Sequence, residues 1–293
     1  MSLFNYYKAF DRTIGWITKE ELEVLKQKRV AIAGLGGVGG YHLLTLLRLG
    51  VTKFHLAEMD VVELANFNRQ ACASVSKIGQ EKINVLDQLG HDINPEADFK
   101  LFPEGVHEGN IESFLDGVDL YVDGLDFFVL DIRQKIFQAC DRKNIPSMTT
   151  APLGMGASHL NFLPGQMSFD QYFCLDDVTG DDRFIKFMVG VSPAMLQRGY
   201  LVDLSRVNFA QRKGPSTPMA CELCAGIAGT EALKILLNRG GVRAAPKGFQ
   251  FDAYRNVMRR TWRPMGNRNP FQKILFWLVK RILNKKTISP EAD

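Results

Sequence analysis

The sequence lacks long hydrophobic runs. No stretch of its 293 residues has about twenty uninterrupted apolar residues, the length needed to cross a bilayer. Residues 1–12 also lack the apolar core of a signal peptide. The sequence has five cysteines. An odd number, in a chain long enough to fold without disulfide bonds, indicates reduced thiols. These absences predict a cytoplasmic protein without a membrane-spanning helix.

Net charge is also low. The formal net charge is +4, and much of the basic excess lies in about the last forty residues. The body is therefore close to neutral and lacks a general nucleic-acid signature, which makes tRNA an unfavoured partner without excluding it. With 46% hydrophobic residues, the chain suffices for one large α/β domain, alone or with a smaller attachment.

The sequence does contain a glycine cluster between a strand-like and a helix-like segment. Residues 29–33 are mostly apolar with β-branched members, and residues 41–49 are rich in leucine. Between them, Gly34, Gly36 and Gly39 fit the GxGxxG spacing, in which missing side chains allow a tight turn and the close approach of a phosphate. The pattern predicts a nucleotide site at a helix N-terminus.

An acidic pair follows the next expected strand. Residues 53–57 form that strand, and Glu58 and Asp60 come directly after it. An acidic residue at this place binds ribose hydroxyls in Rossmann-type sites. Glu58 is therefore the ribose candidate, with Asp60 as its neighbour; a surface role at a strand end is the alternative.

A polar loop after the acidic pair distinguishes this sequence from that of an ordinary dehydrogenase. Residues 63–70 are rich in Asn and contain Arg69, and Lys82 follows. Fixed cations near a phosphate turn are what a triphosphate with a leaving pyrophosphate requires. The bridged pyrophosphate of a dinucleotide has no such requirement.

Taken together, these motifs resemble the E1-like adenylyltransferases. That family includes ubiquitin-activating enzymes and the bacterial enzymes that activate sulfur-carrier proteins in thiamine and molybdopterin synthesis. The resemblance covers roughly residues 10–165, with a weaker likeness over 221–238. The matching motifs are Gly34-Leu-Gly-Gly-Val-Gly39, Glu58 with Asp60, Asn66-Phe-Asn-Arg-Gln70, Lys82 and Asp123-Gly-Leu-Asp126.

This resemblance implies ATP and Mg²⁺ as cofactors and a carboxylate as substrate. Asp126 would bind Mg²⁺, and Arg12 would reach the γ-phosphate held by the other subunit of a homodimer. The implied catalytic residues are Arg12, Arg69, Lys82 and Asp126, and the implied nucleotide-binding residues are Gly34, Gly36, Gly37, Gly39, Glu58, Asp60, Asn66, Asn68 and Lys82.

Two positions depart from the family pattern. Glu58 stands where Asp is usual, which lengthens the reach to ribose but keeps the charge. Phe127 stands where Asn is frequent, so a polar contact near the metal is missing and turnover is expected to suffer.

The expected fold is a Rossmann-like, doubly wound, mostly parallel sheet with an antiparallel C-terminal extension. Residues 1–265 would form the adenylation domain, with an N-terminal arm over 1–27 and a crossover or substrate segment over 164–220. Residues 266–293 would add a basic amphipathic helix and tail.

The spacing of the cysteines does not indicate a metal site. Cys221 and Cys224 form one CxxC, but no second pair exists to complete a Cys₄ zinc site. Packed thiols are favoured over functional ones, and a helix start at this point would lower the pKa of either thiol. Cys174, an alternative acceptor thiol, is expected to be idle.

The C-terminal helix is expected over residues 271–286. It could lie on an anionic membrane, dock on a partner, or pack on its own domain. The apolar residues expected to share one face are Phe271, Ile274, Leu275, Leu278 and Ile282.

Four functions remain open from sequence alone. The first is activation of the C-terminus of a ubiquitin-like or sulfur-carrier protein, and the second is a reaction similar to that of the tRNA threonylcarbamoyladenosine dehydratases. An NAD-dependent oxidoreductase would explain the glycines and Glu58 but not residues 66–70, Lys82 or Asp126. A non-catalytic nucleotide-binding scaffold is the fourth.

Overall fold

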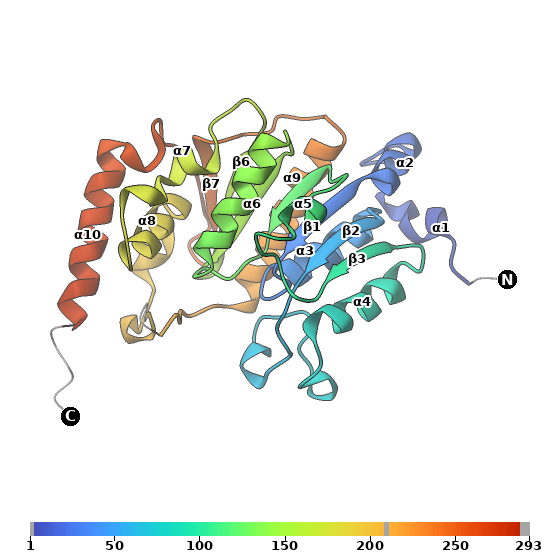
Figure 1. Ribbon diagram of the computed structural model, residues 1–293, viewed down its shortest axis with the longest axis horizontal. Coiled ribbons are helices and arrows are strands. Elements are labelled where there is room, and N and C mark those ends of the chain that lie inside the picture. The colour runs from blue at the N-terminus through green and yellow to red at the C-terminus, as the bar shows by residue number, and fades with distance from the viewer. Residues whose placement is uncertain (1–2, 208–210, 288–293) are drawn as a thin grey trace.

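The chain folds around one eight-stranded mixed sheet (Figure 1). The computed structural model describes residues 3–207 and 211–287, and the order of strands across its sheet is β3-β2-β1-β4-β5-β6-β7-β8. The strands are β1 (Arg29–Ala33), β2 (Lys53–Ala57), β3 (Asp98–Phe102), β4 (Leu120–Asp123), β5 (Ser147–Leu153), β6 (Gly156–Phe162), β7 (Lys247–Asp252) and β8 (Val257–Trp262).

Strand direction divides the sheet into two parts. Strands β3, β2, β1, β4 and β5 are mutually parallel, whereas β6, β7 and β8 are joined antiparallel at the β5 edge. The chain leaves β1 toward β2 and β3, then returns to place β4 on the other side of β1. This switch point is where ligands bind in open α/β sheets. The expected fold class is confirmed.

Helices cover both faces of the sheet. They are α1 (Tyr6–Phe10), α2 (Lys19–Gln27), α3 (Gly39–Leu49), α4 (Lys82–Ile93), α5 (Ile111–Phe114), α6 (Leu130–Arg142), α7 (Phe169–Phe173), α8 (Asp182–Val191), α9 (Pro218–Leu236) and α10 (Pro270–Thr287).

Alternation along the strands assigns each helix to a face. In β1, Val30 and Ile32 pack in a core with residues of α2, α3, α4 and α9. Ala31 and Ala33 face the other way, into a core with residues of α5, α6, α7 and α8. Because successive side chains in a strand point to opposite faces, one five-residue strand anchors both layers.

The N-terminal arm packs at the edge where the parallel strands begin. Thr18 caps α2 in a reciprocal capping box with Glu21. The Tyr6 hydroxyl donates a 2.6 Å hydrogen bond to the carbonyl of Gly50, which ends α3 just before β2. At the far end of α9, Arg239 pairs with Glu21. The arm is thus fixed at the amino ends of the strands.

The segment over 164–220 is more regular than the expected crossover loop. It contains α7 and the ten-residue helix α8, neither of which was expected from the sequence. Helix α8 starts within an acidic, glycine-containing stretch that resembles a turn, and it is stabilised by packing against α10. Tertiary contacts therefore override the local signal here.

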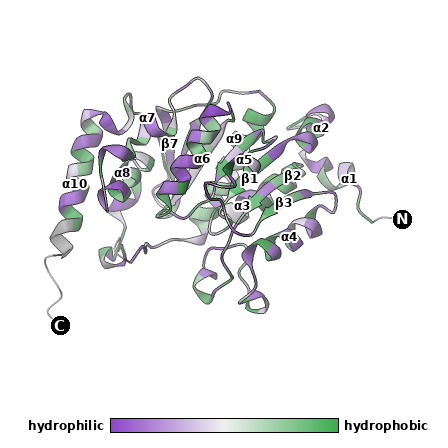
Figure 2. Cartoon of the chain, viewed as in Figure 1, coloured by the Kyte–Doolittle hydropathy of each residue, from purple (hydrophilic) through white to green (hydrophobic). Residues whose placement is uncertain are grey.

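The C-terminal helix lies against α8, and one member of the expected apolar face, Leu275, belongs to the row that packs there. Val279 is buried among residues of α8, with Leu275 and Phe276 beside it. Most of the expected face points outward instead, including Phe271 and Ile274. In Figure 2, hydrophobic residues, coloured green, recur along α10 between hydrophilic residues, coloured purple. The helix has two apolar rows. Sequence periodicity alone does not say which row packs.

No helix within the described ranges is both long and apolar enough to cross a membrane.

Candidate nucleotide-binding site

The glycine turn joins β1 to α3 and leaves a helix N-terminus without a side-chain cap. Gly34 has φ +80°, a conformation that glycine adopts without strain, and its N–H donates to the Ala57 carbonyl at 2.8 Å. Helix α3 begins at Gly39, and the N-cap residue Val38 makes no side-chain cap hydrogen bond. The first N–H groups of α3 therefore need another acceptor, and an anion is the ligand suited to that role.

The glycine turn touches the loop that follows β4. A Cβ on Gly34 would lie 2.5 Å from the carbonyl oxygen of Gly124 and 2.8 Å from the Cα of Leu125. A Cβ on Gly124 would lie 2.9 Å from the Cα of Gly39. The two loops pack backbone to backbone, which sets the loop carrying Asp126 directly beside the phosphate turn.

Glu58 braces the same turn from β2. One carboxylate oxygen, Oε2, accepts a 2.8 Å hydrogen bond from the N–H of Leu35. The other, Oε1, accepts from the N–H groups of Met59 and Asp60, both at 3.0 Å. The extra methylene relative to Asp lets the buried carboxylate reach the turn. Glu58 therefore lies where the ribose next to the phosphate turn is expected, and it also holds the turn in place.

Two hydrogen bonds between Lys82 and Asp60 join the two ends of the polar loop that lies between these residues. The Lys82 ammonium donates to Oδ2 of Asp60 at 3.0 Å, and the Lys82 N–H donates to the Asp60 carbonyl at 2.9 Å. The side chain of Lys82 is buried while that of Asp60 is largely exposed. A buried ammonium held by one exposed carboxylate is a fixed positive charge at the rim of the loop.

The polar loop that contains Arg69 lies against the glycine turn. A Cβ on Gly37 would lie 3.8 Å from Cδ of Arg69 and 3.4 Å from Sγ of Cys221. The side-chain amide of Asn68 accepts from Arg69 at 2.9 Å and donates to the Ser216 carbonyl at 3.0 Å. These contacts bring Arg69 next to the turn and tie its loop to the start of α9.

Asn66 has a structural role in the same loop. Its side-chain oxygen accepts from the N–H of Glu63 at 2.9 Å, and Asn66 itself is buried. Neighbouring Gln70 is also buried, and its Oε1 has no hydrogen-bond partner among the described residues. The Gln70 amide nitrogen lies 3.6 Å from where a Cβ on Gly36 would be. The buried amide of Gln70 thus lies beside the phosphate turn with its oxygen unpaired among the described residues.

Asp126 lies exposed just beyond the end of β4. Its Oδ1 accepts from the N–H of Phe128 at 2.9 Å, a local turn that orients the carboxylate. Asp123, in contrast, is buried and forms an ion pair with Arg133 at 2.9 Å. It also accepts from the Thr149 hydroxyl at 2.8 Å. Asp123 is therefore the structural member of the pair.

Arg133 on α6 is the residue that the sequence analysis missed. Besides Asp123, its guanidinium donates to the carbonyls of four loop residues at 2.6 to 3.4 Å. Those residues are Leu125, Asp126, Phe127 and Val129. Arg133 thus fixes the backbone on which Asp126 is carried. A helical arginine after such a loop has no distinctive spacing, so only the contacts identify it.

Phe127 joins the loop to the crossover segment. Its ring lies 5.0 Å from the ring of Phe128 and 5.4 Å from that of Phe187 on α8, centroid to centroid. The guanidinium of Arg133 lies 4.9 Å from the Phe187 ring. The aromatic residue at this position packs the loop against α8.

Arg12 is the one implied site residue that the fold sets apart from the rest. It is exposed in the short helix Asp11–Thr13, on the arm that packs where the strands begin. The glycine turn lies at the opposite edge, where the strands end. The fold therefore places Arg12 away from the glycine turn of its own chain.

The cysteines lie in the core. All five are free and buried, and burial raises the pKa of the Cys174, Cys221 and Cys224 thiols. The expected lowering by a helix N-terminus is wrong for Cys221 and Cys224, because α9 begins at Pro218 and desolvation dominates. Within residues 3–207 and 211–287, no three His, Cys, Asp or Glu side chains are grouped to hold a metal ion.

A phosphate turn at the switch point, an acidic residue after β2 and a carboxylate loop after β4 define an E1-like nucleotide-binding fold. Comparison with known sequences agrees: the chain belongs to the ThiF family, whose signature matches residues 10–272.

Individual relatives span several activities. The chain is 34% identical to the tRNA threonylcarbamoyladenosine dehydratase of Bacillus subtilis over 151 residues, which is 51% of this chain and 57% of that protein. It is 34% identical to ubiquitin-like modifier-activating enzyme 5 of Culex quinquefasciatus over 140 residues, 43% of this chain and 34% of that one. The match thus spans little more than half the length of the dehydratase.

Solved structures show the same architecture. E. coli MccB with ATP superposes with a TM-score of 0.62 at 18% identity, covering 84% of this chain and 66% of that one. E. coli TcdA, a tRNA N6-threonylcarbamoyladenosine dehydratase, in complex with AMP gives 0.60 at 19% identity, covering 81% and 98%. At these identities the likeness establishes the fold.

Proposed function

We propose that this protein is an ATP-dependent adenylyltransferase that activates a carboxylate. A carboxylate oxygen of the substrate attacks the α-phosphorus of ATP, the bond from the α-phosphorus to the bridging oxygen breaks, and pyrophosphate leaves. The product is an acyl-adenylate. The protein contributes alignment of the reactants and neutralisation of phosphate charge.

One observation carries the proposal: the glycine turn and the loop of Asp126 are in backbone contact. The contact runs through Gly34 and Gly124, which leave no room for side chains. A phosphate on the turn would thus lie beside an exposed carboxylate. This arrangement suits a metal-bound nucleotide phosphate, whereas the bridged pyrophosphate of NAD has no use for a carboxylate at this point.

The surrounding residues supply the charge that the reaction needs. Arg69 and Lys82 would offset the charge of the transferring and leaving phosphates. Glu58, with Asp60 beside it, would hold ribose, and Asn66 and Asn68 would shape the loop over the phosphates.

Asp126 fits Mg²⁺. A single carboxylate, completed by phosphate oxygens and water, is the ligand set that Mg²⁺ takes in nucleotide sites. When bound, the ion would supply charge neutralisation to the phosphates. The chain's own contribution is the orientation of the Asp126 carboxylate through Phe128 and Arg133.

The active unit would be a homodimer. Arg12 lies on the arm at the opposite edge of the sheet from its own glycine turn, so it would serve the partner's site. The sequence resemblance to E1-like adenylyltransferases supports this arrangement.

For the substrate, we favour the C-terminus of a ubiquitin-like or sulfur-carrier protein. Relatives named ubiquitin-like modifier-activating enzyme 5 and probable molybdopterin-synthase adenylyltransferase support it. A small carboxylate on tRNA is the second candidate, supported by the Bacillus subtilis dehydratase at 34% identity. Both share the same first step, since each begins with a carboxylate and ATP.

Pyrophosphate–ATP exchange tests the reaction. Purified protein would be assayed with peptides ending in glycine and, separately, with tRNA carrying threonylcarbamoyladenosine. Lys82→Ala and Asp126→Asn should each abolish exchange. The matched controls are Lys77→Ala, on the same polar loop, and Asp131→Asn, five residues beyond Asp126; both should retain it.

The outcome also selects the substrate. Exchange stimulated only by glycine-ending peptides would support the carrier, and exchange stimulated only by tRNA would support the second candidate. ATP binding with no exchange on any carboxylate would indicate a nucleotide-binding scaffold and would overturn the proposal.

A further inference from the structure

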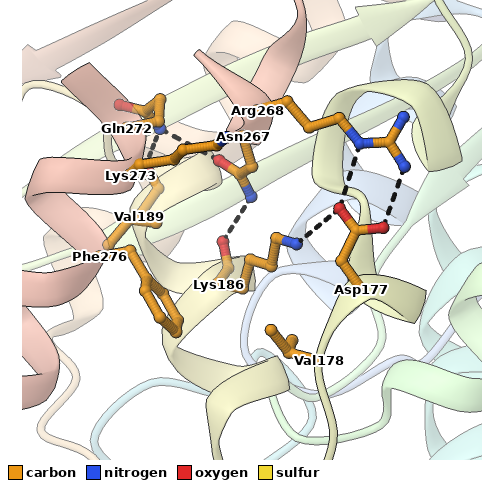
Figure 3. A pocket seen from close by; sticks show the side chains of 9 residues that line it. All are labelled: Asp177, Val178, Lys186, Val189, Asn267, Arg268, Gln272, Lys273 and Phe276. Atoms are coloured by element: carbon orange, nitrogen blue, oxygen red, sulfur yellow. Dashed lines mark hydrogen bonds and ion pairs between the residues drawn. The ribbon is translucent and has the colours of Figure 1, made fainter. Parts of the chain in front are cut away.

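Helix α10 is fixed to the body through one face. The side-chain amide of Gln272 donates to the Val189 carbonyl at 2.9 Å, and Lys280 pairs with Asp182 at 2.6 Å. Just before the helix, Arg268 pairs with Asp177 at 2.9 Å, as Figure 3 shows. These bonds come from α8 and the turn preceding it.

The same anchoring cluster is seen closely in Figure 3. Asp177 receives both Lys186 and Arg268, and Asn267 donates to the Lys186 carbonyl at 2.8 Å. These contacts hold the pKa of Asp177 down at about 2, chiefly through the hydrogen bond from Arg268. The inner face of α10 therefore has a defined orientation, and this fixes which side chains of the helix point outward.

A second face of α10, turned away from α8, is an apolar stripe open to solvent. Phe271 is 76% exposed, Ile274 57%, Leu278 45% and Ile282 53%. The spacings of three, four and four residues place these side chains in one row along the helix. Trp277, 55% exposed, lies beside the row. An exposed apolar row of this size in the described part of a helix calls for a covering surface.

Positive charge predominates in this C-terminal part of the sequence. Lys273 and Arg281 are exposed on α10, and the Arg281 guanidinium lies 5.4 Å from the Trp277 ring. From Ala253 to Pro290 the sequence contains no acidic residue. Over the same stretch it has ten basic ones, which are Arg255, Arg259, Arg260, Arg263, Arg268, Lys273, Lys280, Arg281, Lys285 and Lys286.

We propose that the outer face of α10 docks the protein on an anionic lipid surface, with the helix lying in the plane of the membrane interface. Apolar side chains would enter the boundary between headgroups and acyl chains, while the flanking cations contact anionic headgroups. Trp277, beside an arginine, has the amphipathic character that suits this depth.

An apolar row together with positive charge favours a lipid surface as the partner of this face of α10 over RNA or a second copy of the chain. An RNA backbone would satisfy the cations but would leave Phe271, Ile274 and Leu278 exposed to water. A second copy of this chain would present the same cations and the same acid-free stretch, so like charges would meet across a two-fold axis. An anionic bilayer complements both the charge and the apolar row.

Vesicle co-sedimentation of the full chain tests this proposal. Vesicles of phosphatidylcholine alone would be compared with vesicles that also contain about 30% phosphatidylglycerol. Binding should need the anionic lipid and weaken with salt. The triple variant Ile274→Ser, Leu278→Ser and Ile282→Ser should reduce binding by about tenfold or more, because apolar burial is lost.

One matched control and one charge variant keep the test specific. Val24→Ser replaces an exposed apolar residue on α2, at the other end of the molecule from α10 in Figure 1, and should leave binding unchanged. Lys273→Gln with Arg281→Gln should reduce binding mainly at low salt. Circular dichroism should be the same for all variants, since the substituted side chains are exposed.

Three results would overturn the proposal. The first is equal sedimentation of wild type and triple variant with anionic vesicles. The second is a change from dimer to monomer in the triple variant by analytical ultracentrifugation, which would make the stripe an interface between copies. The third is tight binding of tRNA that survives the triple variant, with no binding to vesicles. None of these readouts depends on adenylyltransferase activity.

Discussion

A side chain on Gly34 would collide with the backbone of Gly124: its Cβ would lie 2.5 Å from the Gly124 carbonyl oxygen. The turn after β1 and the loop after β4 are therefore packed as bare backbone. Gly39 completes the contact from the first turn of α3. This backbone contact explains why glycine is needed at position 124, between Asp123 and Leu125, as well as in the phosphate turn.

Replacing Gly124 should separate the two loops. In Gly124→Ala, the new methyl group would lie 2.9 Å from Cα of Gly39 and closer still to the Gly34 carbonyl, so backbone must move. We expect a loss of about 1–3 kcal/mol in the free energy of unfolding, measured in urea, and weaker ATP binding. Gly226→Ala, on α9 with open space around it, is the control and should not destabilise. Unchanged ATP affinity in Gly124→Ala would contradict the packing argument.

Arg133 should be a major determinant of stability around the candidate site. In Arg133→Met, the buried Asp123 carboxylate loses its ion-pair partner, and four loop carbonyls lose the donor that Arg133 supplies. The expected cost is about 3–5 kcal/mol of unfolding free energy, measured by chemical denaturation. Lys135→Met, an exposed change on the same helix, should cost less than about 0.5 kcal/mol.

A double variant separates the ion pair from the carbonyl contacts. Asp123→Leu combined with Arg133→Met removes both charges, so its cost should be smaller than the sum of the two single changes. Additive costs would show that the pair is not coupled and would contradict the assignment.

Much of the scaffold could be predicted from sequence, because its signals are local. Strands β1 and β2 have the predicted bounds, 29–33 and 53–57, since each is a short apolar run ended by a turn or an acidic residue. The helix cap at Thr18 follows from side-chain chemistry that acts over three residues. The parallel core then follows from the alternation of strands and helices.

The parts that escaped prediction depend on contacts between distant segments. Arg133 meets Asp123 across a loop, and Gly124 meets Gly34 across some ninety positions of sequence. The pKa of Cys221 depends on burial, which sequence position near a helix start does not reveal. For α10, two apolar rows compete, and only α8 determines which one packs.

Two buried histidines should make the protein less stable in mild acid. Burial lowers the pKa of His42 to about 3 and that of His159 to about 4. Both rings stay neutral in the folded protein at pH 5, whereas the unfolded chain binds protons at histidine below a pH of about 6.5. The unfolded state therefore takes up more protons, and the free energy of unfolding falls as the pH falls from about 6.5 toward 4.

The variant His42→Leu isolates this effect. Urea unfolding at pH 7.5 and pH 5 should show a smaller difference than in wild type, by about 2 kcal/mol. His107→Gln, a change on an exposed residue, is the control and should keep the wild-type difference. An unchanged pH dependence in His42→Leu would argue against a neutral, buried ring.

Arg12 should act on the site of the other subunit. Arg12→Ala and Lys82→Ala are each expected to be inactive in pyrophosphate–ATP exchange, because each removes one cation from every site. Refolding an equal mixture should restore about a quarter of wild-type activity, since half of the dimers are mixed and each has one intact site. A mixture that stays inactive would show that Arg12 does not act across subunits.

The most direct test of the central claim is calorimetric titration of the purified protein with ATP and Mg²⁺, and separately with NAD⁺. ATP should bind, and Lys82→Ala should weaken ATP binding by about tenfold or more, because a charge-assisted contact to phosphate is lost. NAD⁺ should not compete. Tight binding of NAD⁺ without binding of ATP would contradict the account.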